Sequence, residues 1–293
     1  MLYNEIISRE SVDKGWSGDR KYHVRTAHGE YLLRVSPAEK APRRAAEFHR
    51  VQALAALGVP MCDPVEFSVQ DEGACTLLRW IDGRDAEEVI PTLPETQQYR
   101  CGLDAGQILK KIHSIPAPAG THNWEEYFNR KIDRKLEMYH SCPLHYDGGE
   151  HFVAYLAANR HLLKDRPQCY QHGDYHIGNM MIDGNGALTI IDFDKDDYGD
   201  PWEEFNRIVW CAQASPRFAS GLVDGYFDGA VPEKFWRLLA LYISSNALGS
   251  LPWAIPFGEK EVAVMRRQAA EILHWYDNMT GIIPRWYTPE RTI

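Results

Sequence analysis

The chain has 293 residues, 44% of them apolar and 25% charged, and it carries a formal net charge of −9. This acidic balance argues against a nucleic-acid-binding protein, because such proteins gather Lys and Arg against phosphates. No segment approaches the roughly 20 apolar residues that span a bilayer, and the opening residues lack a signal-peptide pattern, so we expect a cytoplasmic protein without nucleic-acid or membrane partners.

The first third of the chain is predicted to form β-strands around one helix. Residues 21–36 contain two β-rich runs with a turn at His28–Gly29, and residues 63–83 form a second hairpin that turns at Asp71–Gly73. Between them, residues 37–60 have apolar side chains at helical spacing, and a Gly-x-Pro sequence ends the helix. The apolar positions of this helix are Phe48, Val51, Leu54 and Leu57.

The rest of the chain is predicted to be mainly helical. Helical periodicity is found in residues 94–115, 124–142 and 150–165 and through the C-terminal third. A short β-island at residues 180–194 interrupts it and turns at Asp-Gly-Asn-Gly, a strong hairpin signal. We therefore predict an α+β fold with two lobes. Residues 1–82 form an antiparallel sheet with one main helix, and residues 83–293 form a helical lobe that carries a loop and the hairpin.

The segment HGDYHIGN, residues 172–179, contains the residues with the clearest chemical pattern. His172 and Asp174 are separated by one residue, Asn179 follows after four more, and Asp192 ends the apolar run LTIID. This is the spacing of a kinase catalytic loop, H-x-D-x-x-x-x-N, followed by a strand that ends in an aspartate. The first aspartate would orient the attacking hydroxyl and accept its proton, while an amide oxygen and a second carboxylate hold magnesium on nucleotide phosphates.

A zinc-dependent hydrolase is an alternative for the same segment. His172, Asp174 and His176 form an H-x-D-x-H triplet, but no second carboxylate–histidine cluster accompanies it. The six cysteines are scattered without a CxxC pair, so we expect reduced thiols rather than a zinc site or a disulfide framework. Metal analysis would distinguish a zinc enzyme from a magnesium-dependent kinase.

The segments HGDYHIGN, IIDFD and GDPWEEF together resemble the aminoglycoside phosphotransferase family, which is related to choline and macrolide kinases and has a protein-kinase-like fold. The segments KGWSGDRKYHV, YLLRVS, LLRWIDG and AGQILKKIHSI follow the order that this family shows, so the resemblance covers nearly the whole chain. It implies that Asp174 is the catalytic aspartate and that Asn179 and Asp192 are the magnesium ligands. It also implies that Asp200 braces the site.

The resemblance also implies a nucleotide site in the N-terminal lobe. The loop GWSG would cover the phosphates. In LLRWIDG, the peptide groups of Arg79 and Ile81 would bind the adenine, and Leu78 would line the back of its pocket. Arg34 stands where the family commonly has a lysine; it keeps the charge but binds phosphate through a planar fork, so the exchange is not neutral. The implied nucleotide-binding residues are Gly15, Ser17, Gly18, Arg34, its partner Glu47, Leu78, Arg79 and Ile81.

The predicted reaction moves the γ-phosphate of ATP or GTP to a hydroxyl of a small molecule, with magnesium as cofactor. Acidic residues after Asp192 favour a cationic acceptor such as an aminoglycoside-like antibiotic; they are Asp196, Asp197, Glu203 and Glu204. A choline-like amine, a macrolide or a sugar is an alternative acceptor. A pseudokinase that only binds nucleotide is an alternative function, although Asp174, Asn179 and Asp192 are all present. The sequence leaves ATP versus GTP and the oligomeric state open.

Overall fold

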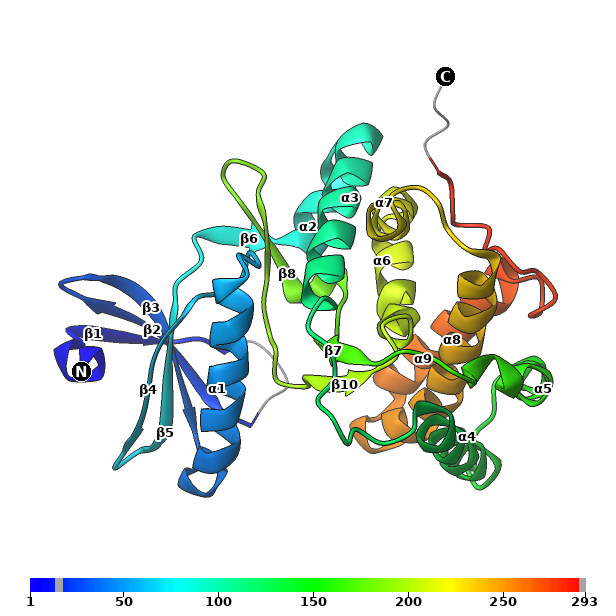
Figure 1. The fold of residues 1–293 in the computed structure, drawn as a ribbon, viewed down its shortest axis with the longest axis horizontal. Helices are drawn as coiled ribbons and strands as arrows, with labels where there is room; N and C mark the ends of the chain where they lie inside the picture. Colours follow the sequence, from blue (N-terminus) through cyan, green and yellow to red (C-terminus); the bar gives the residue numbers. More distant parts are fainter. Residues whose placement is uncertain (14–17, 290–293) are drawn as a thin grey trace. The chain divides into compact units, whose positions relative to one another are not determined.

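A computed structural model describes residues 1–13 and 18–289 of the chain (Figure 1). Its contacts define two compact units. The first comprises Met1–Ala86 and Asn179–Asp196, and the second comprises Glu87–Gly178 and Asp197–Ile293. The predicted lobe boundary at residue 82 stays a prediction, but the structure groups the hairpin segment with the first unit rather than with the helical residues around it.

The first unit contains a five-stranded antiparallel sheet with the strand order β1-β2-β3-β5-β4. Its elements are β1 (Ser8–Ser11), β2 (Arg20–Thr26), β3 (Gly29–Ser36), α1 (Ala41–Ala56), β4 (Pro64–Gln70) and β5 (Gly73–Arg79). Both predicted hairpins and the predicted helix are confirmed. The predicted apolar face of α1 is buried at Phe48, Val51 and Leu54, whereas Leu57 lies beyond the end of the helix and is exposed.

A smaller three-stranded sheet completes the first unit, with the order β6-β8-β9. Its strands are β6 (Gly83–Asp85), β8 (Met180–Asp183) and β9 (Leu188–Ile190). The predicted turn forms because the Asp183 carboxylate accepts hydrogen bonds from the N–H groups of Asn185 and Ala187, both at 2.8 Å. The Ile190 N–H donates to the Pro60 carbonyl at 2.9 Å. These pairings explain why the hairpin belongs to the first unit.

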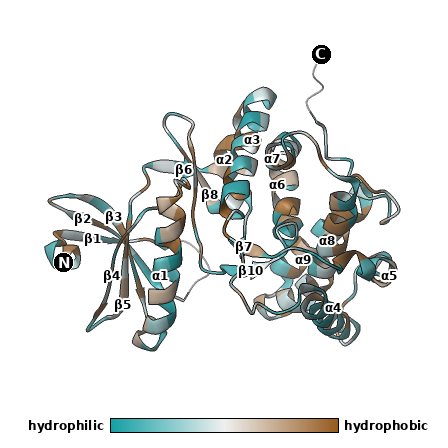
Figure 2. Cartoon of the chain, viewed as in Figure 1, coloured by the Kyte–Doolittle hydropathy of each residue, from teal (hydrophilic) through white to brown (hydrophobic). Residues whose placement is uncertain are grey.

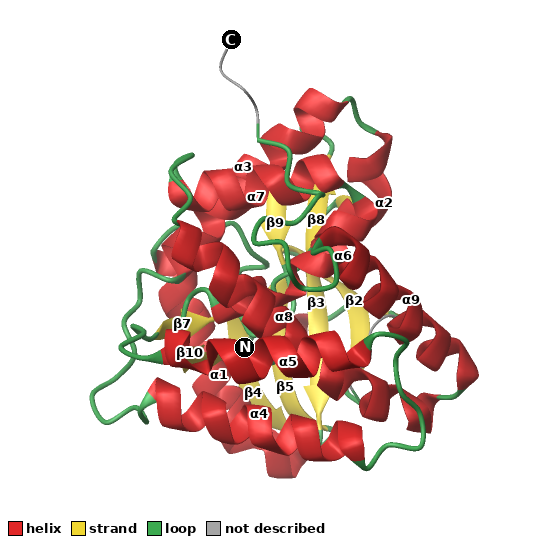
Figure 3. Ribbon diagram, turned by 90° about the vertical axis from the view of Figure 1, so that its right-hand side faces the viewer, coloured by secondary structure: helices red, strands yellow, loops and turns green. Residues whose placement is uncertain are grey.

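The second unit is mainly helical, as the red ribbons of Figure 3 show. Its helices are α2 (Ala86–Val89), α3 (Glu95–Ile112), α4 (Trp124–His140), α5 (Gly149–Asn159), α6 (Ile208–Ala214), α7 (Pro216–Phe227), α8 (Glu233–Ala254) and α9 (Glu259–Trp275). A short antiparallel pair lies among them, β7 (Cys169–Gln171) and β10 (Asp197–Gly199). The 3₁₀ segments of the chain are η1 (Leu2–Glu5), η2 (Ala38–Lys40), η3 (Ile90–Thr92), η4 (Arg160–Leu163), η5 (Ile177–Asn179), η6 (Glu203–Arg207) and η7 (Ile255–Phe257).

Helix α8 forms much of the core of the second unit. Figure 2 shows it mainly in brown, whereas the amphipathic α4 is mainly teal. Contrary to the sequence-based expectation, Glu233–Phe257 is long and apolar enough to cross a bilayer. However, 67% of its most apolar window is buried inside the protein, as expected for a core helix that meets the same length and hydropathy criteria.

Close packing of α3 on α7 supports the segment that carries the candidate catalytic residue. Gly102 and Gly106 of α3 lie against α7 so closely that a Cβ at either position would overlap α7 backbone atoms. The same holds for Gly221 and Gly225 of α7 against α3. The hydroxyl of Tyr175, in the loop after β7, donates to the Ala105 carbonyl of α3 at 2.7 Å, so this loop is attached to the helix pair.

Candidate active site

The loop that follows β7 in the second unit is held by Glu204 of η6. Its two carboxylate oxygens accept hydrogen bonds from the backbone N–H groups of His172 and Gly173, each at 2.7 Å. Gly173 has a φ of 84°, a left-handed conformation that favours glycine. His113, directly after α3, lies 3.3 Å from the same carboxylate. The loop backbone before Asp174 is therefore fixed by a buried acid.

This geometry corrects the prediction that Glu204 contacts a cationic substrate. Its side chain is only 1% exposed, and both of its oxygens face the loop backbone. Glu203 beside it forms an ion pair with Lys131 of α4 at 3.0 Å. Burial would raise the pKa of Glu203, but the charge and hydrogen bond of Lys131 outweigh it, so the pKa lies below the ordinary value.

Asp174 points its carboxylate towards a basic side chain. Arg207 Nε lies 3.1 Å from Asp174 Oδ1, and His176 Nε2 lies 3.7 Å from the same oxygen. The carboxylate is partly exposed, as a group that meets a substrate must be. Arg207 was not among the predicted site residues, because an arginine at the end of an acidic segment gives no signal of its own in the sequence.

The two histidines of the loop stabilise its backbone. Nδ1 of His172 accepts a hydrogen bond from the Asp174 N–H at 3.2 Å, and Nδ1 of His176 accepts one from the Gly178 N–H at 3.1 Å. Each imidazole therefore binds the N–H two residues further along the chain. Within residues 1–13 and 18–289, no group of three or more His, Cys, Asp or Glu side chains converges as a metal site. The zinc-hydrolase alternative has no geometric support there.

Asp200 supports the same region through buried hydrogen bonds. It is completely buried, and its carboxylate accepts two hydrogen bonds from Arg166, at 2.7 and 2.9 Å, and one from the Tyr242 hydroxyl at 2.5 Å. Asp197, a predicted substrate residue, lies exposed in β10, and its carboxylate accepts the Tyr198 N–H at 2.8 Å. The structure thus gives Asp200 a supporting position and leaves Asp197 at the surface.

In the first unit, the hairpin brings the two predicted magnesium ligands next to each other. The Ile191 N–H donates to the Asn179 carbonyl at 3.0 Å, so Asn179 and Asp192 flank the open end of the β8–β9 pair. Asp192 has a φ of 66°, a left-handed turn directly after the strand run. An amide and a carboxylate supply hard oxygen donors, and Mg²⁺ completes its shell with waters and phosphate oxygens. This donor set fits magnesium.

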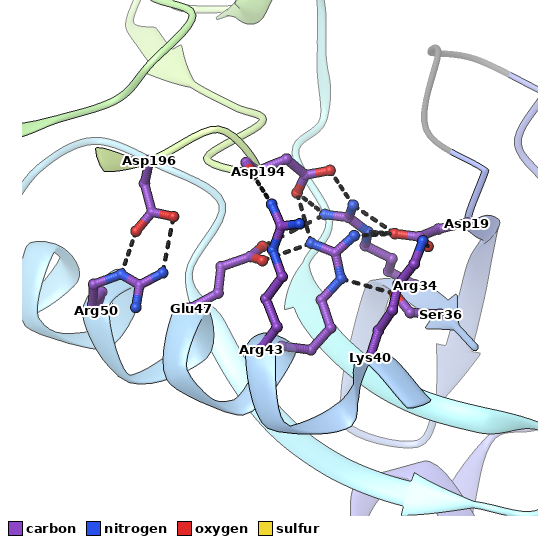
Figure 4. A network of polar contacts seen from close by, with 10 residues as sticks. Asp19, Arg34, Ser36, Lys40, Arg43, Glu47, Arg50, Asp194 and Asp196 are labelled. Atoms are coloured by element: carbon purple, nitrogen blue, oxygen red, sulfur yellow. Dashed lines mark hydrogen bonds and ion pairs between the residues drawn. The ribbon is translucent and has the colours of Figure 1, made fainter. Parts of the chain in front are cut away.

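A buried network of charges surrounds Arg34 of β3 (Figure 4). Its terminal nitrogens bind both carboxylate oxygens of Asp194, and its Nε donates to Asp19 at 2.6 Å. The predicted partner Glu47 lies further away, at 3.7 Å. Burial would lower the pKa of Arg34, but the contacts with Asp194 and the other carboxylates raise it above the ordinary value. Arg34 is a permanent cation in this network.

Arg44 of α1 is a second buried cation in the network and was not predicted. It donates to Asp19 at 2.5 Å, to Glu47 at 2.6 Å and to the Ser36 hydroxyl at 2.9 Å. Burial and the nearby charge of Asp194 raise the pKa of Glu47 to about 7, against the opposing effect of Arg44. In the sequence, the i, i+3 spacing of Arg44 and Glu47 was the available signal.

Asp196 also forms an ion pair with a residue of α1. Its carboxylate binds the guanidinium of Arg50 through two nitrogens, and the Asp196 side chain is only 5% exposed (Figure 4). We expected Asp196 to face the substrate because it follows Asp192 so closely. Instead, it lies in the first unit and ties the segment after the hairpin to the helix.

The predicted adenine-binding residues lie at the end of β5. Leu78 pairs with Leu32 of β3 in the sheet. The Arg79 N–H donates to the Asp63 carbonyl at 2.9 Å, so this donor is already used within the chain. Ile81 follows in the connector to β6. Of the predicted phosphate loop, Gly18 is described and exposed, whereas Gly15 and Ser17 lie outside the described residues.

Comparison with known proteins agrees with the catalytic-loop pattern. The family model for the phosphotransferase enzyme family (APH) matches residues 8–236. The chain belongs to this family. The enzyme is accordingly a small-molecule phosphotransferase with an alcohol group as acceptor.

Solved structures show the same fold at low sequence identity. A choline/ethanolamine kinase family protein from Mesorhizobium loti has a TM-score of 0.66 and 17% identity, covering 94% of this chain and 91% of that one. A thermostable mutant of aminoglycoside phosphotransferase APH(4)-Ia, in ternary complex with ADP and hygromycin B, has a TM-score of 0.65 and 16% identity, covering 93% and 95%. ADP-bound APH(2'')-Ib has a TM-score of 0.62 and 17% identity, covering 92% and 96%. No curated protein sequence matches the chain.

Proposed function

We propose that this enzyme transfers the γ-phosphate of ATP or GTP to a hydroxyl of a small molecule, with Asp174 as the catalytic residue. The observation that carries the proposal is the loop-and-hairpin arrangement. Asp174 follows a fixed backbone turn, and the hairpin then returns so that Asn179 and Asp192 flank its open end. The nucleotide part is supported by the ADP in two structures of similar fold.

The chain's own residues supply orientation and proton transfer. Asp174 accepts a hydrogen bond, and then the proton, from the attacking hydroxyl. Glu204 keeps the loop in one conformation, which matters because phosphoryl transfer depends largely on positioning and on neutralising charge. When Asn179 and Asp192 hold magnesium, the ion neutralises charge on the phosphates.

Arg34 is the proposed phosphate-binding cation of the first unit. Its two terminal nitrogens, which match the geometry of a phosphate, are bonded to Asp194 in this structure. Nucleotide binding by Arg34 therefore requires phosphate oxygens to replace this carboxylate. Asp194 acts as an internal competitor in this proposal.

Substitutions of Arg34 and Asp194 are expected to change nucleotide affinity in opposite directions. Arg34→Gln removes a charged donor and should weaken binding of MgATP by about 10- to 100-fold, while Asp194→Asn weakens the competitor and should tighten it. Isothermal titration calorimetry measures both. Arg25→Gln is the matched control, because that side chain of β2 is 53% exposed and has no place in the proposed nucleotide site. Equal affinities of the Arg34→Gln variant and the wild type would refute the assignment of Arg34.

The reaction itself is tested by nucleotide turnover. A coupled assay should detect ADP or GDP release that requires both Mg²⁺ and an added acceptor. The panel contains aminoglycosides, macrolides, choline-like amines, sugars and hydroxy acids, each assayed with ATP and with GTP. A protein that binds nucleotide but releases no product with any acceptor would instead support the pseudokinase alternative.

A further inference from the structure

Three basic side chains of the second unit lie on two elements that an ion pair joins, and one of these elements also contacts Asp174. They are Lys131 and Lys135 of α4 and Arg207 of η6. Arg207 contacts Asp174 at 3.1 Å, and Lys131 pairs with Glu203 at 3.0 Å. Lys135 interacts electrostatically with Lys131, Glu203 and Arg207. Arg207 thus contacts the candidate catalytic carboxylate, Lys131 is joined to the same segment η6 through Glu203, and Lys135 lies one helical turn from Lys131 on α4.

Lys135 differs from its neighbours because it lacks a close carboxylate. Within the described ranges 1–13 and 18–289, its ammonium makes no hydrogen bond and no ion pair within 4.0 Å. Burial and, next, the charge of Lys131 lower its pKa to about 7, and Glu203 opposes this only in part. A partly buried cation beside other cations is unfavourable unless an anion joins it.

The structure holds Lys135 in this position. Its outer side-chain carbons pass over Gly249 of α8, and they lie 3.1 to 3.3 Å from the point where a Cβ of residue 249 would be. A larger residue on α8 would displace the stem. In the part of the chain that the structure describes, packing on α8 and not an ion pair holds the Lys135 side chain.

The charges in this cluster do not suit a polycationic acceptor. The cluster contains three cations, Lys131, Lys135 and Arg207. Its ion pairs contain two carboxylates, Asp174 and Glu203, although the whole chain has a net charge of −9. Glu204 and Asp196, which we expected to attract an amine, are buried against the loop backbone and Arg50. An amine would meet like charge here, whereas an anion would complete the cluster.

We propose that the acceptor carries an anionic group, a carboxylate or a phosphate, in addition to the hydroxyl that is phosphorylated, and that Lys135 and Arg207 bind this group. The inference rests on the proposed phosphotransferase function. Arg207 has several donors in one plane, so it can contact Asp174 and the anion together and place the hydroxyl at Asp174.

The chemical step balances without a further reactant. The acceptor oxygen forms a bond to the γ-phosphorus, and the bond from that phosphorus to the β–γ bridging oxygen breaks. The hydroxyl proton passes to Asp174, and the nucleoside diphosphate leaves with the bridging oxygen. The anionic group of the acceptor takes no part in bond changes, so its contribution is to binding and orientation.

The test compares the affinities of matched probes for the enzyme. The enzyme is saturated with MgADP, so that the anionic probes cannot bind at the nucleotide site. The probes are D-glucose, D-glucosamine, D-gluconate and D-glucuronate, together with glycerol, glycerate and glycerol 3-phosphate, all at equal ionic strength. Binding is measured by calorimetry for the wild type and for Lys135→Gln. Lys234→Gln is the matched control, because Lys234 is exposed in the same unit. Comparing the carboxylate probes with glycerol 3-phosphate shows whether the site binds a carboxylate or a phosphate.

At least one acidic probe is expected to bind the wild type better than its neutral and amine counterparts. Its affinity should fall about tenfold or more in Lys135→Gln and stay unchanged in Lys234→Gln. Failure of every acidic probe to bind, stronger binding of D-glucosamine, or equal affinity in Lys135→Gln would overturn the proposal. If MgADP itself does not bind, that result counts against the phosphotransferase function. The affinity of the acidic probes can still be measured in the absence of MgADP, so the two failures are distinguishable.

Discussion

Asparagine in place of Asp174 is expected to lower turnover by about 10²- to 10⁴-fold while nucleotide affinity stays unchanged. An amide of the same shape cannot accept the proton of the hydroxyl. Asp174 belongs to the second unit, whereas the proposed nucleotide contacts at Arg34, Asn179 and Asp192 belong to the first. Turnover is measured by coupled product release, and affinity by calorimetry with MgADP.

Asp228→Asn is the matched control for this substitution. Its carboxylate is 69% exposed and pairs with Lys110 on the surface, so the same chemical change should leave turnover unaffected. A thermal melt of each variant shows whether the fold is retained. Turnover like that of the wild type in Asp174→Asn would remove Asp174 from the mechanism.

Glutamine in place of Glu204 is expected to destabilise the enzyme and slow it at the same time. Each carboxylate oxygen accepts a backbone N–H of the loop, and a glutamine amide would place its NH₂ group against one of these donors. A buried donor left without an acceptor costs about 1 to 3 kcal/mol, and more when a charge is involved. Denaturant unfolding measures the loss, and hydrogen exchange at the Gly173 amide locates it.

The distinguishing result for Glu204→Gln is a lower kcat with unchanged MgADP affinity, since the loop belongs to the second unit. Glu126→Gln is the control, because Glu126 is 72% exposed in the first turn of α4 and should change stability by less than about 0.5 kcal/mol. If Glu204→Gln unfolds at the same denaturant concentration as the wild type, Glu204 does not hold the loop.

Local sequence patterns were sufficient to predict much of the fold. The hairpins of the first sheet, α1, α3 and the β8–β9 turn each depend on spacing and turn residues within about twenty positions. The strand β1 was missed because Ser8–Ser11 is short and polar and is ordered by pairing with β2. The pair β7–β10 was missed because its strands have three residues each and lie far apart in the chain.

The acidic residues show where sequence reasoning stops. Asp196, Glu203 and Glu204 are equivalent in the sequence, as charges close to a candidate site. In the structure they bind Arg50, Lys131 and the loop backbone respectively. Which partner each acid meets depends on tertiary packing, and the positions of Arg44 and Arg207 depend on it in the same way.

The first unit is built from two segments that are far apart in the sequence, and this affects its folding during synthesis on the ribosome. Its residues 1–86 leave the exit tunnel long before residues 179–196, which supply two strands of its second sheet. Arg34 precedes its carboxylate partner Asp194 by 160 positions, and Arg44 precedes it by 150. The nascent N-terminal segment therefore holds an incomplete charge network until about two thirds of the chain has been translated, and a fragment ending at residue 86 would lack the same elements permanently.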